Sequence, residues 1–185
     1  MPTRGLGNQL TMADTSGSGD GTPLGVVAVG ASAGGVEALT KFAANLPADL
    51  PYAILVTLHL PPGGPSVLRK ILDRSGPLPA TTAVDGAPLE AGHIYVAAPD
   101  RHLLVHDHHV VMSEGPTENG HRPAINALFR SVAVNFGPHA VGILLSGVLD
   151  DGVLGAAAIR ARGGTVVVQQ PQDALFPSMP NNAIR

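Results

Sequence analysis

The chain has 185 residues but no cysteine and no tryptophan, and aromatic residues make up only 3% of it. The absence of cysteine excludes a disulfide framework, a thiolate metal site and a thiol nucleophile, and it is compatible with a reducing compartment. Charged residues are also few, at 14% with a net charge of -3. Since no block of lysine or arginine is present, the charge pattern favours neither nucleic acid nor an anionic membrane as a partner.

Long apolar runs are absent as well. No segment approaches the ~18 consecutive apolar residues of a membrane helix, and the chain does not start with an apolar signal core. We therefore predict a cytoplasmic protein without direct membrane insertion. The first 23 residues are a polar mixture rich in glycine, serine, threonine and aspartate, which predicts a disordered leader over residues 1–23. Residues 24–185 are long enough for one domain with a hydrophobic core.

Within that domain, short β-branched runs alternate with helical patterns, which is typical of parallel strands joined by helical crossovers. The sequence predicts an α/β fold with a doubly wound, mostly parallel sheet flanked by helices, and a peripheral β-hairpin. Strands are expected over residues 24–30, 52–58, 93–97, 141–145 and 165–169, and the hairpin over 103–106 and 110–112. Helices are expected over residues 34–44, 65–74, 124–136 and 152–162.

The first strand runs into the pattern Gly30-x-Ser32-x-Gly34. This spacing is typical of a nucleophile elbow, in which a tight turn from strand to helix exposes a serine hydroxyl and glycines relieve the crowding. A glycine-rich turn after a first strand can also cradle a phosphate at a helix N-terminus. The pattern therefore leaves a hydrolase and a nucleotide-binding module open, although the G-x-G-x-x-G spacing of dinucleotide-binding turns is missing.

Two further polar residues follow strands of the predicted sheet. His59 comes after the second strand, and Asp151 follows the predicted strand over residues 141–145. Ligands of parallel sheets bind at the carboxyl ends of strands, so Ser32, His59 and Asp151 can converge there as nucleophile, base and orienting carboxylate. Each also has a structural interpretation, because Ser32 fits a tight turn, His59 fits a loop and Asp151 fits a helix N-cap.

Ordered motifs from residue 26 to residue 184 make the chain resemble the catalytic domain of the CheB-type chemotaxis protein-glutamate methylesterases. The resemblance rests on residues 29–35, 59–61, 92–102, 121–129, 144–152 and 178–180, which read VGASAGG, HLP, GHIYVAAPDRH, HRPAINALF, LLSGVLDDG and SMP.

The resemblance implies that Ser32 is the nucleophile, His59 the general base and then acid, and Asp151 the carboxylate that orients His59. The implied reaction is hydrolysis of glutamate methyl esters on the cytoplasmic domain of a methyl-accepting chemoreceptor, with release of methanol and with glutamine deamidation in some members. Ala33, Gly147 and Val148 would lie in the oxyanion region. Arg122 precedes Pro123 at a predicted helix start beside the catalytic face, so it can contact acidic side chains of the receptor or form an ordinary surface salt bridge. Neither a metal nor another cofactor is implied.

The chain departs from the family pattern in three places. Members commonly carry glycine at the position of Leu149 and methionine or threonine at that of Val148, so we expect a turn of different shape. Members usually have an N-terminal receiver domain, and we expect that mode of regulation to be absent from this chain. They also continue beyond the equivalent of Arg185, so we expect a final helix to be missing.

A third interpretation remains beside the esterase and the nucleotide-binding module. The altered turn at Val148 and Leu149 is compatible with a catalytically idle interaction domain of the same fold. The four histidines His102, His106, His108 and His109 form a cluster that could suggest a metal site, but they lack supporting carboxylates, and we interpret them as a solvated hairpin surface.

Overall fold

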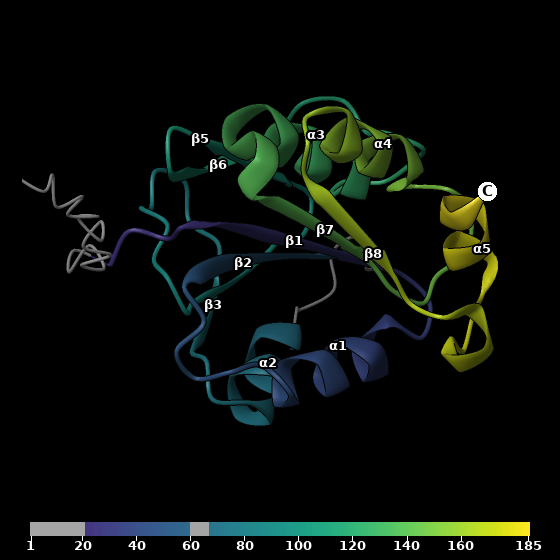
Figure 1. Ribbon diagram of the computed structural model, residues 1–185, viewed down its shortest axis with the longest axis horizontal. Coiled ribbons are helices and arrows are strands. Elements are labelled where there is room, and N and C mark those ends of the chain that lie inside the picture. Colours follow the sequence, from purple (N-terminus) through teal and green to yellow (C-terminus); the bar gives the residue numbers. More distant parts are fainter. Residues whose placement is uncertain (1–20, 60–66) are drawn as a thin grey trace, which may run out of the picture.

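A six-stranded sheet in the order β3-β4-β2-β1-β7-β8 forms the centre of the computed structural model, which describes residues 21–59 and 67–185 (Figure 1). Every neighbouring pair of strands is parallel. The strands are β1 (Gly25–Ala31), β2 (Tyr52–Leu58), β3 (Ala80–Thr82), β4 (Ile94–Val96), β7 (Ala140–Leu144) and β8 (Thr165–Val168). Residues 1–20 of the predicted leader lie outside the described residues.

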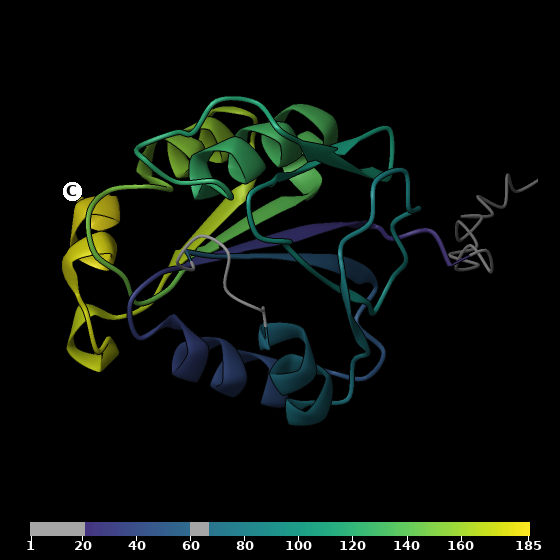
Figure 2. The ribbon, with the colours of Figure 1, turned by 180° about the vertical axis from the view of Figure 1, so that it is seen from behind.

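Helices cover both faces of this sheet, as Figures 1 and 2 show from opposite sides. On one face lie α1 (Gly35–Ala44) and α2 (Leu68–Ser75), and on the other lie α3 (Ile125–Phe136) and α4 (Val153–Ala161). A last helix, α5 (Ser178–Ile184), lies beside the carboxyl ends of the central strands. Two short 3-10 turns, η1 (Gly137–His139) and η2 (Pro171–Asp173), complete the elements. The doubly wound α/β fold predicted from the sequence is confirmed.

The continuous apolar run of β1 reflects burial on both faces. Val26 and Ala28 belong to the core under α3 and α4, while Val27, Val29 and Ala31 belong to the core under α1 and α2. Successive side chains of a strand point to opposite faces, so both faces of a strand between two helical layers favour apolar residues. The first polar side chain comes only where the strand ends, at Ser32.

The predicted hairpin is present as β5 (His102–His106) and β6 (His109–Ser113), which pair antiparallel with His106 opposite His109. The connection consists of Asp107 and His108, whose φ angles are 45° and 59°. Positive φ at both residues of a two-residue connection is the geometry that matches the twist of the strands. His109 therefore belongs to the second strand, not to the connection as predicted.

The interpretation of the hairpin histidines as a solvated surface is wrong for His102, which is only 4% exposed. Its Nε2 lies 2.8 Å from the carbonyl oxygen of Pro116, to which it must donate. Its Nδ1 then accepts from the backbone N–H of Ala124, at 3.2 Å. These contacts with Pro116 and Ala124 bury His102, although it alternates with Leu103 and Val105, the core residues of β5. His106, His108 and His109 are exposed, as expected.

One strand, one helix and the two 3-10 turns were not predicted. Strand β3 has only three residues, which is too short for an alternating pattern to appear. Helix α5 contains a proline and two asparagines, which read as a loop, and it is held by the burial of Met179 and Pro180. The helix predicted over residues 65–74 begins at Leu68 in the described part of the chain, and residues 65–66 lie outside it.

Within residues 21–59 and 67–185, none of the helices combines the length and the apolar character needed to cross a bilayer.

Candidate active site

The carboxyl ends of three neighbouring strands meet beside α5. Strand β1 lies between β2 and β7, so the chain winds away from β1 in both directions along the sheet. Ligands of doubly wound sheets bind at such a switch point, outside the carboxyl ends of the strands. Ser32 directly follows β1, His59 directly follows β2, and Asp151 lies in the segment between β7 and α4. The fold thus brings together the three residues predicted from the sequence.

The turn that carries Ser32 is fixed by backbone hydrogen bonds. The N–H of Ser32 donates to the carbonyl of Ser146 at 3.0 Å, and the N–H of Gly35 donates to the carbonyl of Ser32 at 2.8 Å. Gly34 has a φ of 71°, which favours glycine. At Gly30, a Cβ atom would lie 2.3 Å from Cγ2 of Ile125. Glycine is therefore favoured at Gly34 by the left-handed backbone conformation and at Gly30 by the close packing of Ile125 from α3.

A chain of hydrogen bonds joins the three side chains. Nδ1 of His59 lies 3.3 Å from Oγ of Ser32, and Nε2 of His59 lies 2.7 Å from Oδ2 of Asp151. An ionised carboxylate can only accept, so Nε2 carries the proton and Nδ1 of the neutral ring presents its lone pair to the serine hydroxyl. The serine therefore donates to His59. This arrangement can remove a proton from Ser32 and stabilise the resulting imidazolium.

Asp151 has a second task, at the start of α3. The side chain is fully buried, Oδ2 also accepts from the N–H of Ile125 at 2.7 Å, and Oδ1 accepts from the N–H of Asn126 at 3.0 Å. Ala124 at the N-cap of α3 offers no side-chain cap, so the carboxylate from the neighbouring loop satisfies the first donors of the helix. Asp151 thus caps α3, and not its own helix α4 as the structural interpretation predicted.

These contacts keep the carboxylate ionised. Burial raises the pKa of Asp151, but the hydrogen bond from His59 and those from the backbone of Asn126 and Ile125 lower it by more. The pKa of Asp151 therefore lies below its usual value of 3.8. The charge that would stabilise a protonated His59 is present at neutral pH.

Asn126 was not assigned a role from the sequence. It is 2% exposed, and its Oδ1 accepts from the N–H of Gly152 at 3.0 Å and of Gly155 at 2.8 Å. Asp151 binds the start of α3 while Asn126 of α3 binds the start of α4, so the two helix starts hold each other. A hint was available in the sequence, because Asn126 stands between Ile125 and the apolar residues 127–129, and an asparagine buried there needs polar partners.

His121 is the second residue that the sequence analysis missed. Its imidazole stacks on that of His59, with ring centroids 3.7 Å apart and an angle of 9° between the planes. Burial lowers the pKa of His121, and the charge of His59 lowers it further, while Asp151 opposes both effects. A neutral His121 can lie flat on His59 without repelling an imidazolium. Nothing in the spacing of the sequence links residues 59 and 121.

The potential metal ligands here are His59, His121 and Asp151, whose donor atoms lie within 4.8 Å of one another. A zinc ion would need these atoms at about 2.0–2.2 Å, with their lone pairs converging on one point. The nearly parallel, stacked rings direct their lone pairs along separate planes, and the Asp151 carboxylate is already shared by three donors. The arrangement suits proton transfer better than metal binding.

The remaining predicted residues differ in what they can offer. The N–H of Gly147 donates to the carbonyl of Phe176 at 3.0 Å and is therefore occupied. The N–H groups of Ala33 and Val148 have no acceptor among residues 21–59 and 67–185. Nη1 of Arg122 donates to the carbonyls of Glu114 and Gly115, at 3.1 Å and 3.0 Å, which ties one edge of the guanidinium to the preceding loop.

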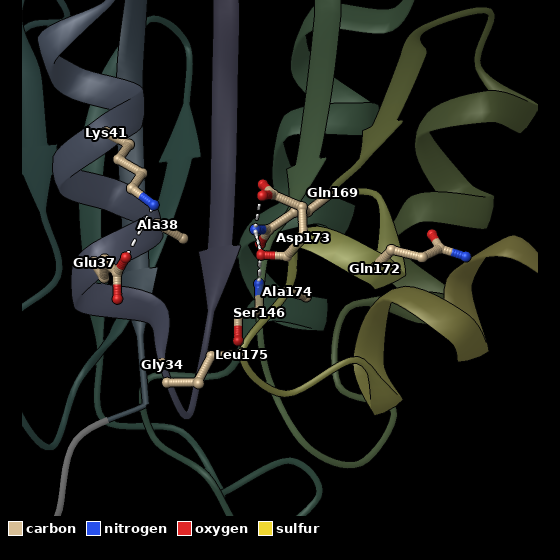
Figure 3. A pocket seen from close by; sticks show the side chains of 10 residues that line it. All are labelled: Gly34, Glu37, Ala38, Lys41, Ser146, Gln169, Gln172, Asp173, Ala174 and Leu175. Carbon is tan, nitrogen blue, oxygen red and sulfur yellow. Dashed lines mark hydrogen bonds and ion pairs between the residues drawn. The ribbon is translucent and has the colours of Figure 1, made fainter.

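A polar pocket of about 280 Å³ adjoins the Ser32 turn (Figure 3). Its walls include the ion pair of Glu37 and Lys41 on α1 and, opposite them, Gln169 and Asp173. Ser146 lies at its base, where Oγ donates to the carbonyl of Ala33 at 2.8 Å. None of the three hydrogen-bonded side chains lines the pocket, and Ser146 in its lining supports the turn through the bond to Ala33.

Comparison with known proteins agrees with this fold. The family model described as CheB methylesterase matches residues 27–185. A protein-glutamate methylesterase/protein-glutamine glutaminase from Anaeromyxobacter dehalogenans is 43% identical over 160 residues, which cover 85% of this chain and 47% of that protein. One from Methanosarcina mazei is 36% identical over 168 residues, covering 86% of this chain and 46% of that protein. The chain thus spans about half the length of the curated relatives it matches.

Among solved structures, the crystal structure of the Thermotoga maritima CheB methylesterase catalytic domain aligns with a TM-score of 0.83 and 29% identity, covering 86% of this chain and 87% of that one. The family model and the relatives both extend over most of the chain. The chain therefore belongs to the CheB methylesterase family.

Proposed function

We propose that this chain is a serine hydrolase that demethylates glutamate methyl esters on the cytoplasmic domain of a methyl-accepting chemoreceptor, and that it deamidates receptor glutamines by the same route. The observation that carries the proposal is the hydrogen-bonded chain from Ser32 through His59 to the buried, ionised Asp151. The printed names of the relatives include both activities. A receptor substrate of this kind implies action in the cytoplasm.

The first half of the reaction forms an acyl-enzyme. Oγ of Ser32 attacks the ester carbonyl carbon while its proton passes to Nδ1 of His59, and Asp151 stabilises the imidazolium through Nε2. The carbonyl oxygen becomes an oxyanion, for which the unoccupied N–H of Ala33 is the nearest donor in sequence to the nucleophile. When the tetrahedral intermediate collapses, Nδ1 returns the proton to the departing methoxide, and methanol leaves.

The second half repeats these steps with water. His59 takes a proton from a water molecule, the hydroxide attacks the acyl carbon, and the proton then goes to Oγ of Ser32 as the ester bond breaks. The products are a free glutamate side chain and regenerated enzyme. With a glutamine substrate, the leaving group in the first half is ammonia and the remaining steps are the same.

Methanol release from a methylated chemoreceptor fragment tests the proposal. We expect activity in the wild type, a loss on the order of 10⁶ in turnover for Ser32→Ala and for His59→Ala, and a loss of about 10⁴ for Asp151→Asn. Asp150→Asn is the matched control, because Asp150 is the exposed neighbour of Asp151. A wild type that releases no methanol, or a fully active Ser32→Ala, would instead support an idle interaction domain.

A further inference from the structure

One aliphatic residue beside the site has an unusual backbone conformation. Among the described residues, five other than glycine have positive φ angles, and four of them are aspartate, asparagine or histidine. Those residue types tolerate the left-handed region, whereas Leu149, with a φ of 68°, pays a steric penalty there. The surrounding structure must therefore impose this conformation on it.

The contacts around Leu149 show how the conformation is imposed. Its carbonyl accepts from Nδ2 of Asn182 at 2.9 Å. The N–H of Val153 donates to the carbonyl of Asp150 at 3.1 Å, and the carbonyl of Gly147 accepts from the N–H of Met179 at 3.0 Å. The backbone on both sides of Leu149 is thus held in place.

Burial of the side chain does not compensate for the strain. Leu149 is 58% exposed, and its neighbour Val148 is 38% exposed. The turn therefore holds two apolar side chains toward solvent on a fixed backbone. Because the backbone of the turn is already fixed, a partner that covers these side chains does not have to order it, which favours binding.

The position of this turn indicates what would cover it. At one end, a Cβ atom on Gly147 would lie 2.9 Å from Cβ of Ser32. At the other end, Asp151 is hydrogen-bonded to His59. Residues 148–150 therefore connect the nucleophile side of the site to the base side. A polypeptide whose ester reaches Ser32 must pass close to this turn.

We propose that Leu149, assisted by Val148, is a specificity-determining residue that packs against an apolar side chain of the substrate protein next to the esterified glutamate. This inference rests on the proposed esterase function, but it makes a separate claim. It concerns the recognition of the chain around the ester, not the hydrolysis itself.

The experiment compares two substrates with the same reacting group. One is a methylated chemoreceptor cytoplasmic fragment, and the other is a single glutamate methyl ester blocked at both ends, which has no neighbouring side chains. We expect Leu149→Asn to lower the ratio of kcat/KM for the protein to kcat/KM for the small ester about tenfold, mainly through KM for the protein. Asparagine tolerates a positive φ, so the turn keeps its conformation.

Leu24→Asn is the matched control. Leu24 is 60% exposed, close to the exposure of Leu149. It directly precedes β1, at the amino-terminal end of the strand, whereas the candidate site lies at the carboxyl end. We expect this variant to leave the ratio unchanged. We also expect Leu149→Asn to melt no lower than the wild type, because it removes no buried contact.

An unchanged ratio in Leu149→Asn would overturn the inference, and so would an equal fall of the ratio in Leu24→Asn. If Leu149→Asn instead melts at a lower temperature and loses activity equally on both substrates, Leu149 has a structural role and the inference is also wrong. The failure of the esterase function itself looks different. In that case neither substrate releases methanol from the wild type, or Ser32→Ala remains active on both.

Discussion

The imidazole of His121 lies flat on the imidazole of His59, with a centroid separation of 3.7 Å and an angle of 9° between the planes. His59 makes in-plane hydrogen bonds at both ring nitrogens, to Ser32 and to Asp151. Two in-plane contacts leave the ring free to tilt about the line that joins them. A flat neighbour restricts that tilt, so His121 acts as a positioning residue for the base.

We expect His121→Ala to lower the turnover of methylated receptor by about 10²-fold, since small displacements of reacting groups have effects of that size. His121→Phe should retain most of the activity, because a phenyl ring preserves the flat contact but has no titratable nitrogen. Methanol release by both purified variants measures this. Equal losses in the two variants would contradict the stacking role and indicate that a nitrogen of His121 is required.

Asn126 should contribute strongly to stability. Asn126→Ala leaves the buried N–H groups of Gly152 and Gly155 without an acceptor, and each unsatisfied donor costs about 1–3 kcal/mol. We expect the free energy of unfolding, measured by urea denaturation, to fall by about 2–4 kcal/mol. Turnover should fall as well, because the hydrogen bond between Asn126 and Gly152 helps to fix the backbone next to Asp151, which orients His59.

Asn135→Ala provides the comparison on the same helix. The side chain of Asn135 is half-buried, and its Nδ2 donates to the carbonyls of Val105 and Ser131. Water can replace a half-buried donor, so the loss of unfolding free energy should be nearer 1 kcal/mol. A loss as small as this in Asn126→Ala would mean that its buried hydrogen bonds are replaced after substitution.

The sequence supported the prediction of the fold and of the three central side chains for one physical reason. Strands β1 and β2 are buried on both faces, so β1 is a continuous apolar run and β2 is interrupted only by Thr57, and the polar residue that follows each strand is conspicuous. Ser32 and His59 are such residues. Asp151 follows the buried β7 and precedes a glycine, which marks the start of another helix.

The supporting residues could not be predicted in the same way. His121 reaches His59, and Asn126 reaches the start of α4, only because α3 and the loop before it pack over the sheet ends. These contacts join residues that are far apart in the sequence, with no fixed spacing. Strand β3 and helix α5 were missed because their short segments acquire their structure from tertiary packing.

The stability of the protein should fall in mild acid, partly because of His121. Its pKa in the folded state is lowered by burial and by His59, from an ordinary value of 6.5. Below about pH 6.5 the unfolded chain therefore binds a proton that the folded chain does not yet bind, so stability decreases as the pH falls toward the folded-state value. His93 contributes in the same direction, because burial lowers its pKa too.

Urea denaturation midpoints between pH 7.5 and pH 5 measure this effect. We expect the midpoint of the wild type to fall over this range and that of His121→Gln to fall less, since glutamine takes up no proton. Asp151 is not the cause in this range, because its lowered pKa makes its contribution disappear only below about pH 3.8. An equally steep decline in His121→Gln would show that other groups account for the pH dependence.

Gly147 should be sensitive to the smallest enlargement. A Cβ atom at this position would lie 2.9 Å from Cβ of Ser32 and 2.6 Å from Cε of Met179. The methionine end can move, but Ser32 is fixed by its backbone hydrogen bonds to Ser146 and Gly35, so relief must displace the nucleophile or the turn after β7. We expect Gly147→Ala to lower turnover by about 10²-fold on any ester substrate.

Gly115→Ala is the control, because a Cβ atom there meets only the hydroxyl of Ser113, at 3.2 Å. A Gly147→Ala variant with the turnover of the Gly115→Ala control would show that the site accommodates the added methyl group without moving Ser32.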